Sequence, residues 1–156
     1  NWGDVEWIKK RWGGKLILKG IMDVEDARLA AQSGADALIV SNHGGRQLDG
    51  APSSIEALPA IAQAVGQDIE VWMDGGIRSG QDVLKARALG AQGTLIGRSF
   101  LYGLGAFGQD GVTRALQIIQ KELDTTMAFC GHTNINNVGT DILLPGTYPQ
   151  PWHDRG

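Results

Sequence analysis

The stretch LKGIMDVEDARLAAQSGADALIVS (18–41) recurs 56 residues later, without gaps, as DGGIRSGQDVLKARALGAQGTLIG (74–97). Each copy reads as a loop, a helix, a Gly-Ala stop, a short apolar strand and a polar loop. The positions that match are Gly20 and Gly76, Ile21 and Ile77, Asp26 and Asp82, Ala30 and Ala86, Gly34 and Gly90, and Ala35 and Ala91. This order of elements is the unit of a parallel α/β sheet, so the repeat predicts a chain of βα units.

The remaining elements follow from hydrophobic spacing on either side of the repeat. Helices are predicted over 4–12, 24–33, 53–65, 81–89 and 109–129, and strands near 16–18, 37–40, 71–73 and 94–96. The strands are apolar throughout, as expected when both faces of a sheet are covered. Trp7 and Trp12 in the first helix are expected to contact the core. The Pro/Gly-rich segment 145–156 lacks periodicity and is expected to form an extended, wrapped or mobile tail.

Successive βα units can form an open doubly wound sheet or close into a (β/α)8 barrel, and the repeat alone does not choose between them. A barrel needs about 250 residues. The chain has 156 residues and four strand candidates, which is about half of one. We therefore expect an α/β half-barrel over 1–144, whose exposed sheet edges require a partner segment.

Composition excludes several classes of protein. The chain is 42% hydrophobic and 20% charged with a net charge of -3, which is typical of a globular domain. It has no block of Lys and Arg that would bind nucleic acid or an anionic membrane surface. The single cysteine, Cys130, cannot form an internal disulfide, and no long apolar run or leader is evident. A cytoplasmic location is expected, with peripheral membrane association of a complete enzyme left open.

Polar clusters follow each of the four strand candidates. They are Lys19-Gly20, residues 41–47 (SNHGGRQ), residues 74–78 (DGGIR) and residues 97–99 (GRS). In both parallel architectures ligands bind at the carboxyl ends of the strands, so these clusters are expected to converge on one face.

The last two clusters each place an arginine, Arg78 or Arg98, directly after glycines and ahead of a helix. Glycine lets backbone N–H groups approach an anion, a helix N-terminus adds partial positive charge, and a guanidinium binds oxygens in pairs. This combination favours a phosphate site over ordinary turns with solvated arginines.

His43 and Arg46 share one loop, where a guanidinium could hold a carboxylate and a neutral imidazole could take a proton. The simpler interpretation is a loop-stabilising histidine beside a surface arginine. Lys19 ends an apolar strand, so it is expected to form an ion pair, to reach solvent, or to act as a functional cation. His132, His153 and Asp49 are interpreted as structural or solvated. No cluster with metal-ligand spacing occurs, so no metal is expected.

The motifs SNHGGRQ, DGGIRSG and LIGRSFLYG, in this order, closely resemble the FMN-dependent α-hydroxy-acid oxidising family, which includes glycolate oxidase, L-lactate dehydrogenase and (S)-mandelate dehydrogenase. The resemblance runs from about Asp4 to Leu144 and corresponds to the C-terminal half of that family's TIM (β/α)8 barrel. It implies FMN as cofactor and oxidation of a lactate-like L-2-hydroxy acid to the 2-oxo acid.

The resemblance also implies a role for each matching residue. His43 would be the catalytic base and Arg46 the group that binds the substrate carboxylate. Lys19 would face the N1/O2 edge of the flavin, where its charge would favour the anionic reduced flavin. This role replaces another that a lysine at this position could have, which is to form a Schiff base. The other residues expected to contact FMN are Ser41, Asp74, Gly75, Gly76, Ile77, Arg78, Gly97 and Arg98.

The chain departs from the family in its extent. The family's N-terminal strands carry substrate-contacting tyrosines, further flavin contacts, a second arginine and an aspartate that pairs with the base histidine. We therefore expect the N-terminal half of the same enzyme as a partner, and a homo-oligomer, a tetramer by resemblance. The alternative is an inactive half-barrel that binds phosphate, FMN or a partner chain without turnover.

Overall fold

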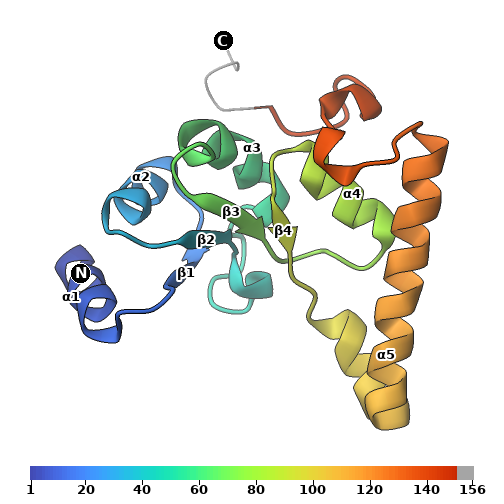
Figure 1. Cartoon of the computed structure of the whole chain (residues 1–156), viewed down its shortest axis with the longest axis horizontal. Coiled ribbons are helices and arrows are strands. Elements are labelled where there is room, and N and C mark those ends of the chain that lie inside the picture. The colour runs from blue at the N-terminus through green and yellow to red at the C-terminus, as the bar shows by residue number, and fades with distance from the viewer. Residues whose placement is uncertain (151–156) are drawn as a thin grey trace.

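The computed structural model describes residues 1–150 and contains one parallel sheet of four strands in the order β1-β2-β3-β4 (Figure 1). The strands are β1 (Ile17–Ile21), β2 (Ala37–Val40), β3 (Glu70–Met73) and β4 (Gly93–Thr94). Neighbours in space are neighbours in the chain, as the repeated βα unit predicts. The predicted fold class, α/β with about four βα units, is confirmed.

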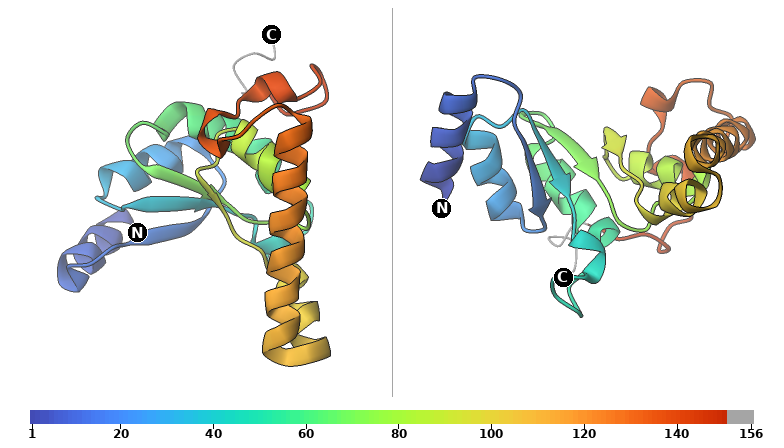
Figure 2. Two further views of the ribbon diagram at one scale, coloured as in Figure 1. Left: turned by 45° about the vertical axis from the view of Figure 1, so that its right-hand side comes forward. Right: turned by 90° about the horizontal axis from the view of Figure 1, so that it is seen from below.

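A helix connects each pair of adjacent strands. The helices are α1 (Trp2–Trp12), α2 (Val24–Gln32), α3 (Ser54–Val65), α4 (Gly80–Ala88) and α5 (Arg98–Phe129), and single 3₁₀ turns occur at His43–Gly45, Ile135–Asn137 and Thr140–Ile142. Figure 2 shows α1 at one end of the sheet and α5 alongside α4 at the other. In residues 1–150, no helix is both long enough and apolar enough to span a bilayer.

The two copies of the repeat fold in the same way because their ends carry equivalent signals. Asp23 caps α2 by accepting the backbone N–H groups of Glu25 and Asp26, and Ser79 caps α4 by accepting that of Asp82. After each helix a glycine in the left-handed region, Gly34 (φ 81°) or Gly90 (φ 107°), turns the chain back toward the sheet.

The core lies between the sheet and helices α2, α3 and α4. Alternate residues of the central strands, Leu38 and Val40 with Val71 and Met73, are buried in one cluster with residues of these helices. Equivalent helix positions, Ala30 and Ala86, are fully buried alanines. Their small size lets each helix approach the sheet closely, which explains why both copies of the repeat have alanine there.

Helix α5 begins eleven residues before the predicted helix start at Gln109. It is two helical segments, because the backbone leaves helical geometry at Phe107 (φ −142°) and Gly108 (φ 57°). The segments pack closely where Gly103 meets Gly111: a Cβ on Gly111 would lie 1.9 Å from the carbonyl oxygen of Gly103. Gly103 and Gly111 therefore both need to be glycine for this contact.

Helix α1 is formed as predicted, but its tryptophans are not in the core. Trp7 is 66% exposed and Trp12 is 68% exposed, and no residue of α1 is buried. The helix is attached through Asp36, whose carboxylate accepts hydrogen bonds from Lys9, from Lys15 at 2.7 Å and from the backbone N–H of Leu16 at 2.8 Å. Trp2 adds an apolar contact with the main core cluster, but Trp7, Ile8 and Trp12 stay exposed within residues 1–150.

The predicted tail starts at residue 145 and is described only as far as residue 150. Within this part, Tyr148 is partly buried and packs against the main core cluster. Residues 151–156, including His153, lie outside the described residues.

Replacing Gly80 with alanine should destabilise the fold. A Cβ there would lie 1.9 Å from the backbone nitrogen of Leu123 in α5, so the two helices would have to separate. We expect the free energy of unfolding to fall by about 1–3 kcal/mol, as for other overpacked sites. Gly105→Ala is the matched control, because its Cβ meets nothing within 4 Å and a helical alanine should stabilise slightly. If urea unfolding gives the two variants the same free energy of unfolding, this interpretation is wrong.

The Asp36 attachment should depend on pH. Hydrogen bonds from Lys15, then Lys9, then the Leu16 N–H hold the pKa of Asp36 well below its usual range. A carboxylate with a lowered folded-state pKa stabilises fully above its ordinary pKa, about 3.9, and loses this effect as the pH falls below it.

The stability difference between the native chain and Asp36→Asn should therefore shrink between pH 7 and pH 3 in urea unfolding. Asp110→Asn, at an exposed position on α5, provides the control. An equal difference at both pH values would show that the charge of Asp36 does not carry the attachment.

Candidate active site

The carboxyl ends of the four strands surround a hollow of about 550 Å³. Lys19 of β1 and the segments that follow β2, β3 and β4 contribute to its wall, as expected for the carboxyl edge of a parallel sheet. Ten of the eleven site residues predicted from the sequence line it: Lys19, His43, Arg46, Asp74, Gly75, Gly76, Ile77, Arg78, Gly97 and Arg98. The eleventh, Ser41, is fully buried and is hydrogen-bonded to Lys19.

Lys19 lies within β1 rather than at its end, and it connects this strand to the ends of β2 and β3. Its ammonium group donates to Ser41 Oγ at 2.6 Å, after β2, and forms an ion pair with Asp74 Oδ2 at 2.5 Å, after β3. The ion pair is one of the alternatives expected for this lysine. Since its side chain is still 39% exposed, the ammonium group also faces the hollow.

Asp74 has one oxygen that lacks a partner. Oδ1 is buried and makes no hydrogen bond within residues 1–150, whereas Oδ2 pairs with Lys19. An unsatisfied buried acceptor is costly, and native structures rarely leave one without a protein, water or ligand partner. The atom is therefore open to a hydrogen-bond donor from outside residues 1–150, such as a water or a ligand with a hydroxyl or N–H group.

His43 has an unusual backbone conformation. Its φ of 56° makes it the one non-glycine residue with positive φ in the described part of the chain. Its ring lies against Gly20, where a Cβ would come within 2.7 Å of Nε2. Gly20 thus needs to be glycine both for its own φ of 103° and for the room that the imidazole takes.

The loop that carries His43 is fixed at its base by Asn42. The side-chain oxygen of Asn42 accepts the backbone N–H of Gly44 at 3.0 Å, and its amide group donates to the carbonyl of Pro52 at 3.1 Å. The backbone N–H of Asn42 donates to Ser54 Oγ at 3.2 Å. Neither Asn42 nor Ser54 was predicted as a site residue, although an asparagine beside glycines is a common turn signal.

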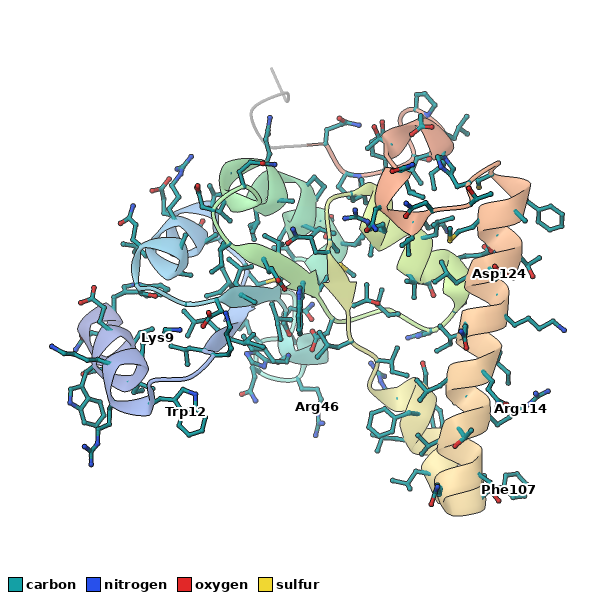
Figure 3. The ribbon with its side chains drawn as sticks, in the orientation of Figure 1. Lys9, Trp12, Arg46, Phe107, Arg114 and Asp124 are labelled. Carbon is teal, nitrogen blue, oxygen red and sulfur yellow. The ribbon has the colours of Figure 1, made fainter. Side chains whose placement is uncertain are left out.

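Arg46 lies three residues beyond His43, and its side chain is exposed. Its backbone N–H donates to the carbonyl of His43 at 3.4 Å. In Figure 3 the guanidinium extends from the loop on the side where the chain passes from β4 into α5. The structure forms no ion pair between Arg46 and any carboxylate of residues 1–150, so its charge is available to a ligand.

Arg78 lies on the loop after β3 and Arg98 is the first residue of α5, and one hydrogen bond joins the two segments, from Ser99 Oγ to the carbonyl of Ile77 at 3.2 Å. Both side chains line the hollow, and neither forms an ion pair with a carboxylate of the described residues. Two guanidinium groups close to a glycine-rich backbone form a suitable site for a phosphate.

The two nearby helix N-termini are not equivalent. At α4, the carboxylate of Glu122 accepts the Gly80 N–H at 2.9 Å, and that of Asp82 accepts the N–H groups of Arg78 and Ser79. At α5, Gly97 occupies the cap position and provides no side-chain hydrogen bond. Only the α5 terminus is therefore left for an anion, a difference that the two similar Gly-Arg motifs did not predict.

The apolar part of the wall consists of Leu95, Ile96 and Leu101. The sequence places the first two on the fourth strand, but they follow β4 as irregular backbone and border the hollow. Their apolar side chains suit a flat, partly apolar ligand.

Comparison with known proteins identifies relatives over nearly the whole chain. A family model described as FMN-dependent dehydrogenase matches residues 1–145. L-lactate dehydrogenase of Caulobacter sp. (strain K31) is 52% identical over 143 residues, which cover 92% of this chain and 38% of that protein. Pre-mycofactocin synthase of Mycobacterium tuberculosis (strain ATCC 25618 / H37Rv) is 49% identical over 146 residues, covering 93% and 37%.

Solved structures give the same result. Mandelate oxidase with benzoyl-formic acid superposes with a TM-score of 0.84 at 48% identity, covering 86% of this chain and 40% of that one. A mandelate oxidase variant with (S)-mandelic acid gives the same values. The chain thus spans about two fifths of the length of these relatives, as expected for half of a barrel.

Proposed function

Because the chain belongs to the FMN-dependent dehydrogenase family, we propose that it is the C-terminal half of an enzyme that oxidises a lactate-like L-2-hydroxy acid to the 2-oxo acid. The observation that carries this proposal is that ten of the eleven candidate residues line the same hollow. The names of its relatives, L-lactate dehydrogenase and mandelate oxidase, support this substrate class.

FMN fits the residues that are present. The unpartnered Oδ1 of Asp74 would accept a ribityl hydroxyl, supported by Ser41 and Lys19 beside it. Arg78, Arg98 and the open N-terminus of α5 would hold the phosphate, together with the backbone of Gly75, Gly76, Ile77 and Gly97. Bound FMN would accept two electrons from the substrate, and the positive charge of Lys19 would favour this uptake.

The substrate would be oriented by the loop after β2. Arg46 would bind its carboxylate, and His43, in neutral form, would take a proton. This proton is either the one on C2 or the one on the hydroxyl group, and both routes need the same imidazole in the same place. The proposal therefore does not depend on which of the two is followed.

The enzyme would need its N-terminal half. The chain spans 38% of its L-lactate dehydrogenase relative, and β1 and β4 each have one neighbouring strand in the described structure. We propose that the missing half pairs with these edges, and that the complete enzyme forms a homo-oligomer. Isolated, this chain would bind FMN weakly and turn over poorly.

An inactive half-barrel is the alternative, one that binds phosphate, FMN or a partner chain without turnover. Adding the N-terminal half distinguishes the two: the enzyme hypothesis expects yellow colour and activity to appear together. Lactate, glycolate and mandelate should be compared with oxygen or a quinone as acceptor, since relatives of similar identity carry different names.

Arg98→Met should weaken FMN binding about 10- to 100-fold, because it removes a charge-assisted contact to the phosphate. Arg114→Met, on the second segment of α5 (Figure 3), is the matched control and should leave affinity unchanged. Flavin fluorescence titration of the chain, alone and with the N-terminal half, measures both. Equal affinities would remove Arg98 from the phosphate site.

In the complete enzyme, Arg46→Met should raise KM steeply and lower kcat/KM by about two to three orders of magnitude, or about 3–4 kcal/mol. His43→Asn should lower kcat about 10²- to 10⁴-fold without weakening FMN binding. Asp49→Asn, on the same exposed loop, is the control. Steady-state kinetics that leave Arg46→Met unchanged would show that Arg46 does not bind the substrate.

A further inference from the structure

We infer that Asn42 and Ser54 are positioning residues that hold His43 in its left-handed conformation over Gly20. This inference rests on the proposed function only in assigning the role of base to His43. Its structural part concerns the conformation of the loop, which can be measured in this chain by itself.

The conformation of His43 requires support from its surroundings. A non-glycine residue at φ 56° is disfavoured because its Cβ crowds the backbone, so adjacent contacts must compensate. Gly44 (φ 69°) and Gly45 (φ 71°) continue the left-handed run. These residues form a single 3₁₀ turn, in which the Gly45 N–H donates to the Asn42 carbonyl at 3.0 Å and the Arg46 N–H donates to the His43 carbonyl at 3.4 Å. Side-chain hydrogen bonds then hold this turn against the rest of the chain.

Asn42 provides two further bonds through its side chain, in addition to the bond from the His43 N–H to Ser41 Oγ at 3.2 Å. Its side-chain oxygen holds the Gly44 N–H at 3.0 Å, which fixes the peptide that follows His43. Its amide group holds the Pro52 carbonyl at 3.1 Å, which joins the start of the loop to its end. One side chain thus closes the loop that carries both His43 and Arg46.

Ser54 anchors Asn42 to the body of the protein. It is 3% exposed, lies in the first turn of α3, and accepts the backbone N–H of Asn42 at 3.2 Å. A Cβ on Gly75 would lie 3.0 Å from its Oγ, so Ser54 also borders the loop after β3. Ser54 therefore contacts both the loop that carries His43, the proposed base, and the loop after β3 that is proposed to bind the flavin.

The adjacent Ser53 has a different role, which makes it a matched control. Its side chain and that of Glu56 form the capping box of α3. Ser53→Ala should weaken the start of the helix, whereas Ser54→Ala removes the bond to Asn42. Comparison of the two variants separates helix capping from loop positioning.

The first measurement is NMR of this chain. The amide-to-Hα nuclear Overhauser effect within His43 is strong at positive φ and weak at negative φ. Asn42→Ala should weaken this effect and speed hydrogen exchange at the Gly44 amide about tenfold or more, while amides of β2 and α3 stay protected. Asn42→Asp keeps an oxygen for the Gly44 N–H and should retain the effect. Ser54→Ala should weaken it, and Ser53→Ala should not.

The second measurement uses the complete FMN-loaded enzyme. Asn42→Ala should lower kcat about 10- to 100-fold with FMN affinity unchanged, because a displaced base loses its alignment. Across the four variants, kcat should fall most in those in which the Overhauser effect within His43 is weakest.

Two results would overturn the inference: an unchanged Overhauser effect in folded Asn42→Ala, or a changed one without loss of kcat. If Asn42→Ala does not fold, the Ser54→Ala and Ser53→Ala pair decides by the same criteria. If no variant or native enzyme oxidises a hydroxy acid, the proposed function fails, while NMR still decides the positioning role.

Discussion

The contact of Lys19 with Ser41 and Asp74 is the interaction on which the arrangement of the site depends. It joins β1 to the ends of β2 and β3 through one ammonium group. Parallel pairing brings those ends to one edge, and the lysine then balances the carboxylate that remains partly buried there. The loops after β2 and β3 begin at these residues, so the positions of His43 and of the glycine-rich segment both depend on it.

Most of the fold could be predicted because its signals are local. Caps, left-handed glycines and small buried alanines recur at equivalent places in the two copies of the repeat. The first segment of α5 was missed since its glycines lower helix propensity, and the close contact between Gly103 and Gly111 that requires them is not visible in a sequence. The amphipathic pattern of α1 indicated a buried face, but within residues 1–150 Trp2 packs against the core while Trp7, Ile8 and Trp12 stay exposed.

The candidate site could be located from the residues, because polar side chains at the ends of apolar strands must meet in a parallel sheet. Their individual roles came from the resemblance to a family, and they remain proposals. The hydrogen bonds of Asn42 and Ser54 could not be predicted, since they depend on loop geometry. Glu122 gave no signal at all, as it reaches Gly80 from a helix 42 residues further along the chain.

The carboxylate of Glu122 at the start of α4 has a consequence for how an elongated ligand can lie across the rim. With one positive helix end neutralised and the other open, the electrostatic potential of the hollow is asymmetric. An anionic group at the rim therefore finds its open helix end at α5, whereas N–H groups at the start of α4 already have carboxylate partners. A negative side chain from α5 thereby limits where along the rim a helix N-terminus can stabilise an anionic group.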